Sequence, residues 1–440
     1  MASRRAFLRR VGAAGLTVAT TSRMSWAADR GEVIPTSFDS KQGGQIKSVN
    51  RREETTVRSG GYGSVVGATW TADDRLLVAI GEGTGWPGLP QDVYFQTALI
   101  EVGGAPHSAT FEAIEDYPIR SLREWYRPGG DPSYYGGGIL AIDQCVYQYV
   151  TSTHGSAYWS ALSHNDPIVS PSVSCTKLIY STDQGRTWRN QDGTQPVYFE
   201  PPKDQDKGSM IFWDEPRGYF SGGVMLLQMG KGYGDNRDGY VYGYSTVTQD
   251  EAEALMLFRV STSNILKRDQ YEFFSGRRDD VSVNWTHDIA ACAPVHRFPR
   301  NWRCGSVVYN APLRRYMMIA NFFKAIDGGL TDEAEPCVLG MWVASHPWGP
   351  WQRIYEESPW RPGGKDMFCY ATHIPSKWIS ADGKSFWMTW TDATAPLAPD
   401  TYEKIWFASG GRDFSDKSDK YFHTLANYRF NAQRIDVTLA

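Results

Sequence analysis

The sequence predicts an all-β chain that folds as one five-bladed β-propeller with four-stranded antiparallel blades, and three observations lead to this class. Helical periodicity is scarce, and residues 249–257 are the one stretch that is clearly helix-capable. Pairs of β-prone runs joined by tight turns recur along the chain. These pairs belong to an internal repeat that is well above ten residues long and contains four strands, which is typical of a propeller.

Five strand pairs are expected to form the inner halves of the blades. They lie at residues 70–78, 139–147, 223–244, 307–319 and 378–388. With the outer strands added, we place the blades near residues 60–110, 130–200, 206–275, 290–356 and 367–435. No low-complexity linker divides these blades, so residues 31–440 are predicted to form a single domain.

One outer hairpin carries a specific turn motif. Residues 181–188 match the Asp-box pattern S-x-D-x-G-x-T-W, in which the aspartate and glycine shape the turn and the tryptophan packs behind it. This role is structural rather than catalytic. Residues 343–351 resemble the matching outer hairpin of a later blade.

The first 30 residues are predicted to be a signal peptide. Ser3-Arg4-Arg5-Ala6-Phe7-Leu8-Arg9 has the twin-arginine form, a mildly apolar run follows, and Ser25-Trp26-Ala27 offers a cleavage site. We therefore expect the Tat translocase to export the chain to the periplasm or beyond. No run is long and apolar enough to span a membrane.

The amino-acid composition limits which ligands and partners are expected. The chain has 17 Trp, 24 Tyr and 19 Phe, and aromatic rings both stack on sugars and fill sheet cores. The net charge is -4 and no basic patch follows the leader, so nucleic acid is not an expected partner. The six cysteines lack CxxC spacing, which argues against structural zinc. Cys292 and Cys304 are the most local disulfide candidate, with buried free thiols as the alternative.

A glycine-rich loop lies at the centre of the chain, between an apolar run at residues 223–229 and an aromatic one at 240–244. It contains Lys231, Asp235, Arg237 and Asp238. Long connections of this kind are often functional. The alternative is a turn in which the two aspartates bond to their own backbone.

Propeller topology sorts the acidic residues by position. We call the end that collects residues before first strands and after second strands the ligand end, and the opposite end the far end. Four aspartates in tight turns between first and second strands belong to the far end and are predicted to be structural: Asp73, Asp74, Asp143 and Asp382. Residues expected at or near the ligand end are Glu82, His154 and Asp392, which follow second strands, His373, which starts a first strand, and Asp288, just upstream of one.

The sequence resembles a family of exported five-bladed propellers, glycosidase- and sialidase-like in fold, first catalogued as a domain of unknown function and later associated with endo-D-arabinanases. The matching pieces are residues 70–74, 81–83, 230–244, 271–276, 285, 314–316 and 376–380. The chain departs from the family in having Gly81-Glu82-Gly83 where Gly-Asp-Gly is usual. It also has Gly60-Gly61-Tyr62-Gly63 where many members carry an acid.

The resemblance implies hydrolysis of a furanoside polymer, which requires two carboxyl groups flanking the scissile bond. It makes Asp238 a functional residue, although strand order places its loop at the far end unless the loop folds back along the axis. We therefore expect Glu82 and Asp238 to be the catalytic pair, with Asp288 and His373 as secondary members. Predicted substrate-binding residues are Trp86, His154, Tyr233, Trp285 and Asp392, with core packing as the alternative for the aromatic ones.

Two functions remain open at this point. The first is an exported glycoside hydrolase acting on arabinan, and the second is a non-catalytic propeller that binds a glycan or another surface partner. Nucleophile-elbow, HExxH and Walker motifs are all missing from the sequence, and no cofactor is expected. His287 and His296 lack diagnostic metal-ligand spacing, and an axial calcium ion is left open.

Overall fold

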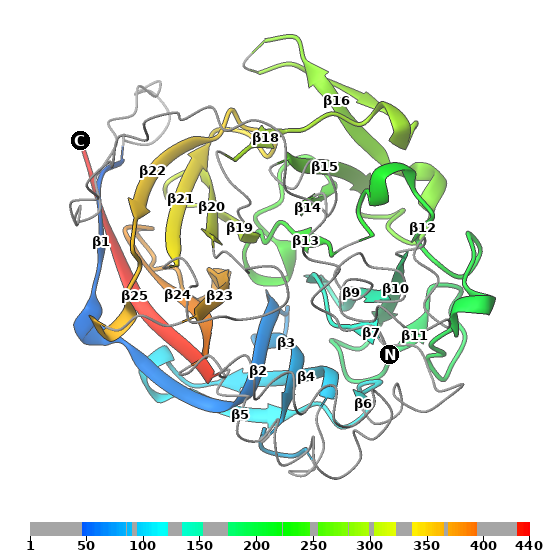
Figure 1. The fold of residues 1–440 in the computed structure, drawn as a ribbon, viewed down its shortest axis with the longest axis horizontal. Coiled ribbons are helices and arrows are strands. Elements are labelled where there is room, and N and C mark those ends of the chain that lie inside the picture. Colours follow the sequence, from blue (N-terminus) through cyan, green and yellow to red (C-terminus); the bar gives the residue numbers. More distant parts are fainter. Residues whose placement is uncertain are drawn as a thin grey trace, which may run out of the picture.

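The structure is a computed structural model of the chain. It describes residues 46–84, 86–89, 95–121, 134–152, 175–221, 223–246, 254–279, 281–298, 303–322, 337–364, 368–393 and 429–440. The strands form five antiparallel blades arranged around a central axis, which confirms the predicted propeller (Figure 1).

Each blade contains four main strands, which run in the following order from the axis outward. Blade 1 has β2 (Val57–Trp70), β3 (Leu76–Thr84), β4 (Phe95–Gly103) and β5 (Thr110–Ala113), and blade 2 has β8 (Ile139–Ile142), β9 (Cys145–Ser152), β10 (Cys175–Ser181) and β11 (Arg189–Asn190). Blade 3 has β13 (Met225–Leu226), β14 (Tyr240–Thr246), β15 (Ala254–Ser261) and β16 (Glu272–Arg277). Blade 4 has β19 (Arg303–Asn310), β20 (Arg315–Phe322), β21 (Val338–Ala344) and β22 (Gln352–Glu357). Blade 5 has β23 (Phe368–His373), β24 (Ser385–Ala393), β25 (Arg429–Leu439) and β1 (Ile46–Arg51).

Short strands extend three of these blades at their edges. They are β6 (Arg120–Ser121), β7 (Tyr134–Tyr135), β12 (Phe212–Trp213), β17 (Val283–Thr286) and β18 (His296–Arg297). The predicted blade limits agree with the observed ones to within four residues at six of the ten ends, but blades 2, 3 and 4 were predicted to start 9–19 residues too early and blade 2 to end ten residues too late. A further difference is at the close of the ring, because the N-terminal strand β1 completes blade 5.

The ring is closed by strands from both ends of the described chain. β1 pairs with β25 in antiparallel register, from Ile46↔Leu439 to Arg51↔Ile435 (Figure 1). β2 then pairs with β25 from Val57↔Ala432 before it becomes the inner strand of blade 1. Blades 5 and 1 consequently form one nine-stranded sheet.

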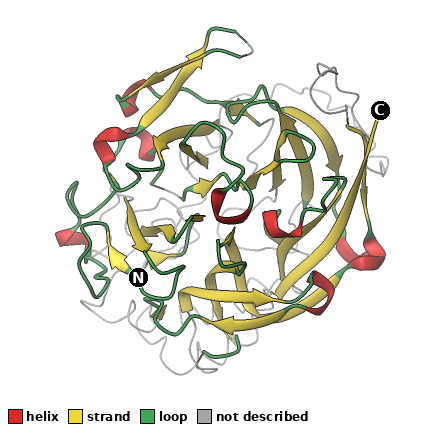
Figure 2. Cartoon of the chain, turned by 180° about the vertical axis from the view of Figure 1, so that it is seen from behind, coloured by secondary structure: helices red, strands yellow, loops and turns green. Residues whose placement is uncertain are grey.

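Helix is limited to short 3-10 turns between strands in the described chain (Figure 2). These turns are η2 (Glu53–Thr55), η3 (Pro106–Ser108), η4 (Pro202–Asp204), η5 (Pro216–Gly218), η6 (Lys231–Tyr233), η7 (Arg268–Gln270), η8 (Ile289–Ala291), η9 (Pro362–Gly364) and η10 (Ser376–Trp378). The helix-capable stretch at 249–257 is strand where the structure describes it, because residues 254–257 belong to β15. Burial on both faces of that strand overrides the local helix propensity. Across the described ranges, we find no helix that is long and apolar enough to cross a membrane.

Apolar cores fill the spaces between neighbouring blades. Between blades 4 and 5 they include Trp360 and Trp390, each 1% exposed. Burying a large apolar side chain stabilises a fold by about 1.5–3 kcal/mol, so these interfaces hold the ring together.

The inner strands meet backbone to backbone near the axis. The Gly138 amide donates to the Val224 carbonyl at 2.8 Å, and the Gln228 amide donates to the Val307 carbonyl at 3.0 Å. A Cβ atom on Gly138 would lie 2.2 Å from the Val224 oxygen. Glycine is therefore needed where inner strands of adjacent blades touch.

The far-end turns are built by their own polar side chains, as predicted for the turn aspartates. The Thr71 hydroxyl bonds to Asp73 at 2.6 Å, and the Trp70 indole donates to Asp74 at 2.8 Å. Hydrogen bonds from the Ser380 hydroxyl and the Lys384 amide lower the pKa of Asp382.

The turn that carries the Asp-box pattern joins β10 to β11. Asp183 accepts hydrogen bonds from the amides of Arg186 and Thr187, and the Trp188 indole donates to the Gly185 carbonyl at 3.0 Å. The Trp188 ring is 3% exposed behind the turn.

The cysteine arrangement differs from the expected local disulfide. Cys292 is a buried free thiol, so its predicted pairing with Cys304 is wrong. Cys292 follows η8 at the outer side of blade 3, whereas Cys304 lies on the first strand of blade 4. Burial raises the pKa of the Cys292 thiol to about 12.

Candidate functional site

The far end of the propeller is crossed by the 230–239 loop. This loop joins the first and second strands of blade 3 and contains η6. The Gly232 carbonyl accepts from the Asp143 amide at 3.1 Å, and Lys231 Nζ lies 3.5 Å from Asp74 Oδ1. A Cβ atom on Gly232, which has a φ of 53°, would lie 3.0 Å from Ala72 Cβ. The loop thus contacts blades 1 and 2 at the far end and does not fold back along the axis.

Asp238 is exposed in this loop and organises the local backbone. Its Oδ2 accepts from the Tyr242 hydroxyl at 2.6 Å, and its Oδ1 accepts from the Tyr240 amide at 3.1 Å. The neighbouring Asn236 completes the turn by accepting from the Gly239 amide at 2.7 Å. These contacts match the alternative prediction, in which the aspartate shapes the turn.

The structure separates the two residues predicted to be the catalytic pair. Glu82 lies near the ligand end of β3, six residues beyond Leu76, where the strand begins at the far end. At about 3.3 Å per residue this is a distance of roughly 20 Å along the strand. Asp238 belongs to the far end, so Glu82 and Asp238 do not flank one substrate bond.

Two aromatic residues predicted to bind substrate are in the core. Trp86 is 1% exposed and packs edge-on against Phe111, with ring centroids 5.3 Å apart. Tyr233 is 4% exposed, and its hydroxyl donates to the Tyr240 carbonyl at 2.9 Å. Burial raises the pKa of Tyr233 well above its usual value. Neither ring offers a free face to a sugar, so core packing is the correct interpretation.

Trp285 is half-buried on the outer strand β17. The Arg259 guanidinium lies 4.2 Å from its ring centroid, and Trp348 and Tyr242 have ring centroids 6.1 and 6.3 Å away. Arg259 therefore occupies one face of the ring. This cluster lies on the outer side of blade 3, away from the axis.

Asp288 does not lie at the ligand end. It follows the outer strand β17, is exposed and caps η8, where its Oδ1 accepts from the Ala290 amide at 2.9 Å. Residues 283–297 form two further strands of blade 3. The prediction for Asp288 was wrong because it assumed that a residue just upstream of the first strand of blade 4 lies at the ligand end. The predicted His154 lies outside the described residues.

His373 ends the first strand of blade 5 instead of starting it. The side chain is 5% exposed, and its Nε2 donates to the Val65 carbonyl of blade 1 at 3.0 Å. Burial lowers the pKa of His373 to about 4. His373 therefore links two inner strands as a neutral imidazole.

Asp392 is the predicted residue that the structure places at the ligand end as a buried acid. It lies near the end of β24 and is 2% exposed. Arg58 donates to its Oδ1 from Nη2 at 2.8 Å and from Nε at 3.2 Å. Burial raises the pKa of Asp392, and Arg58 opposes this rise. A buried carboxyl group with one cationic partner is the type of group that enzymes use for proton transfer.

One row of cross-strand neighbours connects Asp392 to the Glu82 region. Asp392 pairs with Arg429, Arg429 with Tyr62, and Tyr62 with Thr84, two residues beyond Glu82. Each step between neighbouring strands spans about 4.8 Å, so the Cα atoms of Asp392 and Thr84 lie about 15 Å apart. The two acids therefore share the ligand end of blades 5 and 1.

Arg58 was not among the predicted site residues. In the sequence it is recognisable as a charged residue at the start of the β-prone run that forms β2, where a cation can pair with a buried acid.

A second ion pair that the sequence did not predict is buried near the ligand end of blade 2. Lys177 Nζ lies 2.7 Å from Glu200 Oε1, and Gln205 donates to the Glu200 carbonyl at 3.0 Å. The only sequence signal was a lysine within the apolar strand β10. Since both charged groups are partnered, we assign this pair a structural role.

No group of three or more His, Cys, Asp or Glu side chains is placed to hold a metal in the part of the chain that the structure describes. His287 Nδ1 lies 2.9 Å from the Tyr271 carbonyl. His296 is largely buried, and burial lowers its pKa to about 4.

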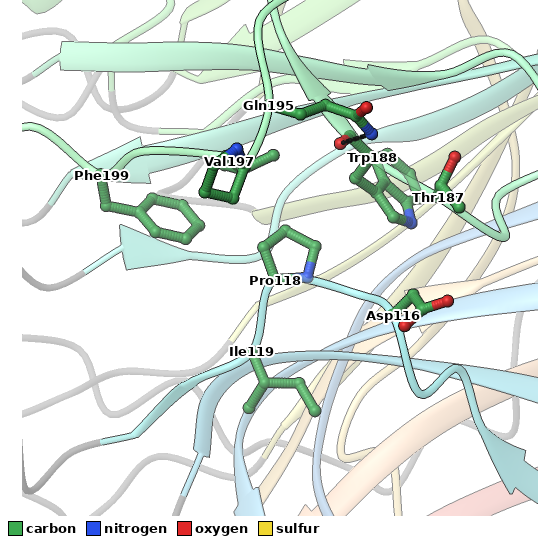
Figure 3. A pocket seen from close by; sticks show the side chains of 9 residues that line it. Asp116, Pro118, Ile119, Thr187, Trp188, Gln195, Val197 and Phe199 are labelled. Carbon is green, nitrogen blue, oxygen red and sulfur yellow. Dashed lines mark hydrogen bonds between the residues drawn. The ribbon is translucent and has the colours of Figure 1, made fainter.

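A pocket of about 720 Å³ lies between the outer parts of blades 1 and 2. Figure 3 shows Asp116 and Pro118 on one side and Trp188, Val197 and Phe199 on the other. The lining is mainly apolar and includes no pair of carboxyl groups. Among the described residues, its lining has one carboxyl group, Asp116, and none of the predicted site residues.

Fold and site together define a five-bladed β-propeller with a loop of blade 3 that contacts blades 1 and 2 at the far end and a buried acid at the ligand end. The family model described as Domain of unknown function (DUF4185) matches residues 148–357, from the second blade to the fourth. No curated protein matches the chain.

Solved structures similar to this chain include propeller glycosidases. The α-L-arabinofuranosidase of Podospora anserina in complex with cellotriose has 10% identity and a TM-score of 0.37, and the match covers 87% of this chain and 91% of that one. The catalytic domain of a Coprinopsis cinerea GH62 α-L-arabinofuranosidase has 9% identity and a TM-score of 0.36, with 88% and 99% covered. A thermostable family-43 glycoside hydrolase has 10% identity and a TM-score of 0.39, with 88% and 94% covered. Because these TM-scores are all below 0.5, we assign the fold from the pairing of the strands and not from these similarities.

Proposed function

We propose that this protein is an exported glycoside hydrolase that acts on a furanoside polysaccharide, with arabinan as the substrate. The observation that carries the proposal is the environment of Asp392. Among the described carboxyl groups with a shifted pKa, Asp392 alone has a raised one, and it lies at the ligand end. Hydrolysis of a glycosidic bond needs one carboxyl group that can act as the acid, for which a raised pKa is favourable, beside a second, ionised carboxylate.

The roles follow from position and environment. Asp392 is the general acid that protonates the leaving oxygen, because burial favours its protonated form. Glu82, near the ligand end of β3, is the second carboxylate and acts as base or nucleophile. Arg58 is a positioning residue that fixes the orientation of the Asp392 carboxyl group. Asp238, Asp288, Trp86 and Tyr233 have no part in this scheme.

The choice of arabinan rests on the motif resemblance to propellers associated with endo-D-arabinanases. The decisive experiment is a screen of purified mature protein against furanose and pyranose polysaccharides, read as reducing-sugar release. We expect release from an arabinan and little from pyranose polymers. Release from a pyranose polymer alone would refute the substrate, and no release from any polymer would refute hydrolysis.

A non-catalytic, glycan-binding propeller is the second candidate. It is favoured by Gly60-Gly61-Tyr62-Gly63, which stands where many similar propellers carry an acid before the first inner strand. The same panel distinguishes the candidates, because a binding module would retain polysaccharide in affinity electrophoresis without releasing sugar.

Export through the twin-arginine route is part of the proposal. Arg4 and Arg5 precede a mildly apolar run, as that route requires. Changing both to lysine should leave folded precursor in the cytoplasm, as measured by fractionation and immunoblotting. Unchanged export would show that another route reads the leader.

A further inference from the structure

Two buried cysteines from neighbouring blades meet at the ligand end of the propeller. Cys337 immediately precedes β21, the third strand of blade 4, and Cys369 is the second residue of β23, the first strand of blade 5. First and third strands both start at the ligand end, so the two cysteines share that end. Cys337 is 4% exposed and Cys369 is 0% exposed. Both are thiols in the structure.

The sulfur atom of Cys337 lies against the backbone and the thiol of Cys369. It accepts a hydrogen bond from the Cys369 amide at 3.1 Å and donates one to the Cys369 carbonyl at 3.5 Å. The two side chains are also hydrogen-bonded to each other, and burial together with this contact raises the pKa of the Cys369 thiol well above its usual value. A disulfide needs two cysteines with Cα atoms about 4.4–6.8 Å apart and side chains that point together. A sulfur atom bonded to its partner's own amide is close enough for the two sulfur atoms to join after small side-chain rotations.

The backbone on both sides of the pair is held by further hydrogen bonds. The Asn321 side-chain amide donates to the Cys369 carbonyl at 2.9 Å, and the Trp360 backbone amide donates to the Cys337 carbonyl at 2.6 Å. Cys369 lies directly opposite Asp392 in the pairing of β23 with β24. Among the described residues, no set of three or more His, Cys, Asp or Glu side chains could hold a metal here. The chemistry that this pair supports is therefore a bond between the two sulfur atoms.

We propose that Cys337 and Cys369 form a disulfide bond that stabilises the contact between blades 4 and 5 beside Asp392. The oxidant is a second disulfide, of the kind that keeps exported proteins oxidised. The thiolate of Cys337, the more exposed of the two, attacks it and releases one oxidant thiolate. Cys369 then loses its proton and displaces the second oxidant thiolate. The pair thus gives up two electrons and two protons, and the oxidant is reduced to two thiols.

The bond would close the loop of residues 337–369 and constrain the unfolded chain, which is how disulfides stabilise proteins. It would also fix the start of β23 against blade 4, at the level of Asp392. The inference rests on no part of the proposed hydrolysis. Its test supplies the oxidant directly, so it does not depend on export either.

The direct test is peptide mass spectrometry of the purified mature protein after incubation with oxidised glutathione. The protein is then denatured in the presence of iodoacetamide, so that free thiols are alkylated before they can exchange. We expect one cross-linked species that joins the peptides of Cys337 and Cys369 and has lost two hydrogen atoms. Dithiothreitol should return both cysteines to the alkylated form. Alkylation of both cysteines in the oxidised sample, or pairing of either with another cysteine, would overturn the proposal.

Cys175 provides a matched control. It is also 0% exposed at the ligand end, and burial raises the pKa of its thiol to about 12. Its Sγ donates to Gln205 Oε1 at 3.1 Å and bonds to no second thiol. Cys175 should therefore be alkylated in oxidised and reduced samples alike. Loss of its alkylation together with that of Cys337 and Cys369 would mark unspecific oxidation and overturn the proposal.

Thermal unfolding tests the stabilising role. The oxidised wild type should melt roughly 5 °C above the reduced wild type, as expected for a bond that closes a loop of this length. Cys337→Ala should melt at the same temperature in both conditions, and Cys369→Ala replaces it if the first variant does not fold. Equal midpoints in the wild type, or a redox shift that persists in the variant, would overturn the proposal.

Discussion

The guanidinium of Arg58 donates two hydrogen bonds to one oxygen of Asp392, at 2.8 Å from Nη2 and 3.2 Å from Nε. Arg58 lies on β2 where that strand still pairs with blade 5, before it enters blade 1. Asp392 lies on the second strand of blade 5. The contact thus joins the proposed acid to the seam at which the propeller closes.

Replacing Arg58 should change the pKa of Asp392 in a defined direction. Arg58 lowers this pKa against the effect of burial, so Arg58→Gln should raise it. A general acid must be protonated, and the alkaline limb of the kcat profile on arabinan should therefore move to higher pH. We also expect the free energy of unfolding to fall by about 1–3 kcal/mol, because the buried carboxyl group of Asp392 loses its hydrogen-bonding partner.

Arg52→Gln is the control for this change, since Arg52 forms exposed ion pairs with Glu54 and Asp436. Its pH profile should match that of the wild type. If Arg58→Gln leaves the alkaline limb in place, Asp392 is not the acid that this limb reports.

Amide substitutions at the two ends should differ greatly in their effect on turnover. Asp392→Asn should lower kcat by at least about a hundredfold, the usual size of a general-acid contribution. Asp238→Asn should stay within about twofold, because Asp238 shapes a far-end loop and its amide analogue can still accept from Tyr242. Reducing-sugar release, with melting temperature as the folding check, makes the comparison. Loss of turnover in Asp238→Asn alone would place the active site at the far end.

The fold was predictable because local signals repeat in every blade. Turn residues such as Asp73 and Asp382 lie between β-prone runs, and their side chains close those turns in the structure. The closing strand β1 carries no such signal, since its partner β25 is almost 400 residues away in sequence. Pairing at that separation is decided by packing between blades rather than by local pattern.

The site was less predictable because residue type does not report burial or register. Trp86 and Tyr233 have the chemistry of sugar platforms, yet both are in the core. Asp288 was misplaced by two additional strands in blade 3. Asp392 lies at the ligand end, where topology alone places residues that follow second strands.

The contact between blades 4 and 5 should not tolerate a side chain at Gly305. A Cβ atom there would lie 1.7 Å from the Thr372 carbonyl oxygen, which belongs to the backbone of the next inner strand. Gly305→Ala should therefore lower the free energy of unfolding by at least about 3 kcal/mol, since neither strand can move without breaking blade pairing. Urea denaturation gives the value.

Gly208→Ala is the comparison for this change. Gly208 lies in an exposed turn, where an added Cβ atom would lie 3.2 Å from Oδ1 of the Asp206 side chain and would meet no backbone atom within 4 Å. Its effect should stay within about 0.5 kcal/mol. Similar stability of the two variants would mean that the inner strands can separate.

Stability should fall as pH drops from about 6.5 to about 4, because two histidines are buried in their neutral form. Burial lowers the pKa of both His373 and His296 to about 4 in the folded state. Between the two pH values the unfolded chain binds more protons, so the free energy of unfolding rises with pH through this window. Each histidine should contribute roughly 2–3 kcal/mol to the change. His373→Gln and His296→Gln should flatten the dependence measured by urea denaturation, and an unchanged slope would show that neither histidine titrates on unfolding.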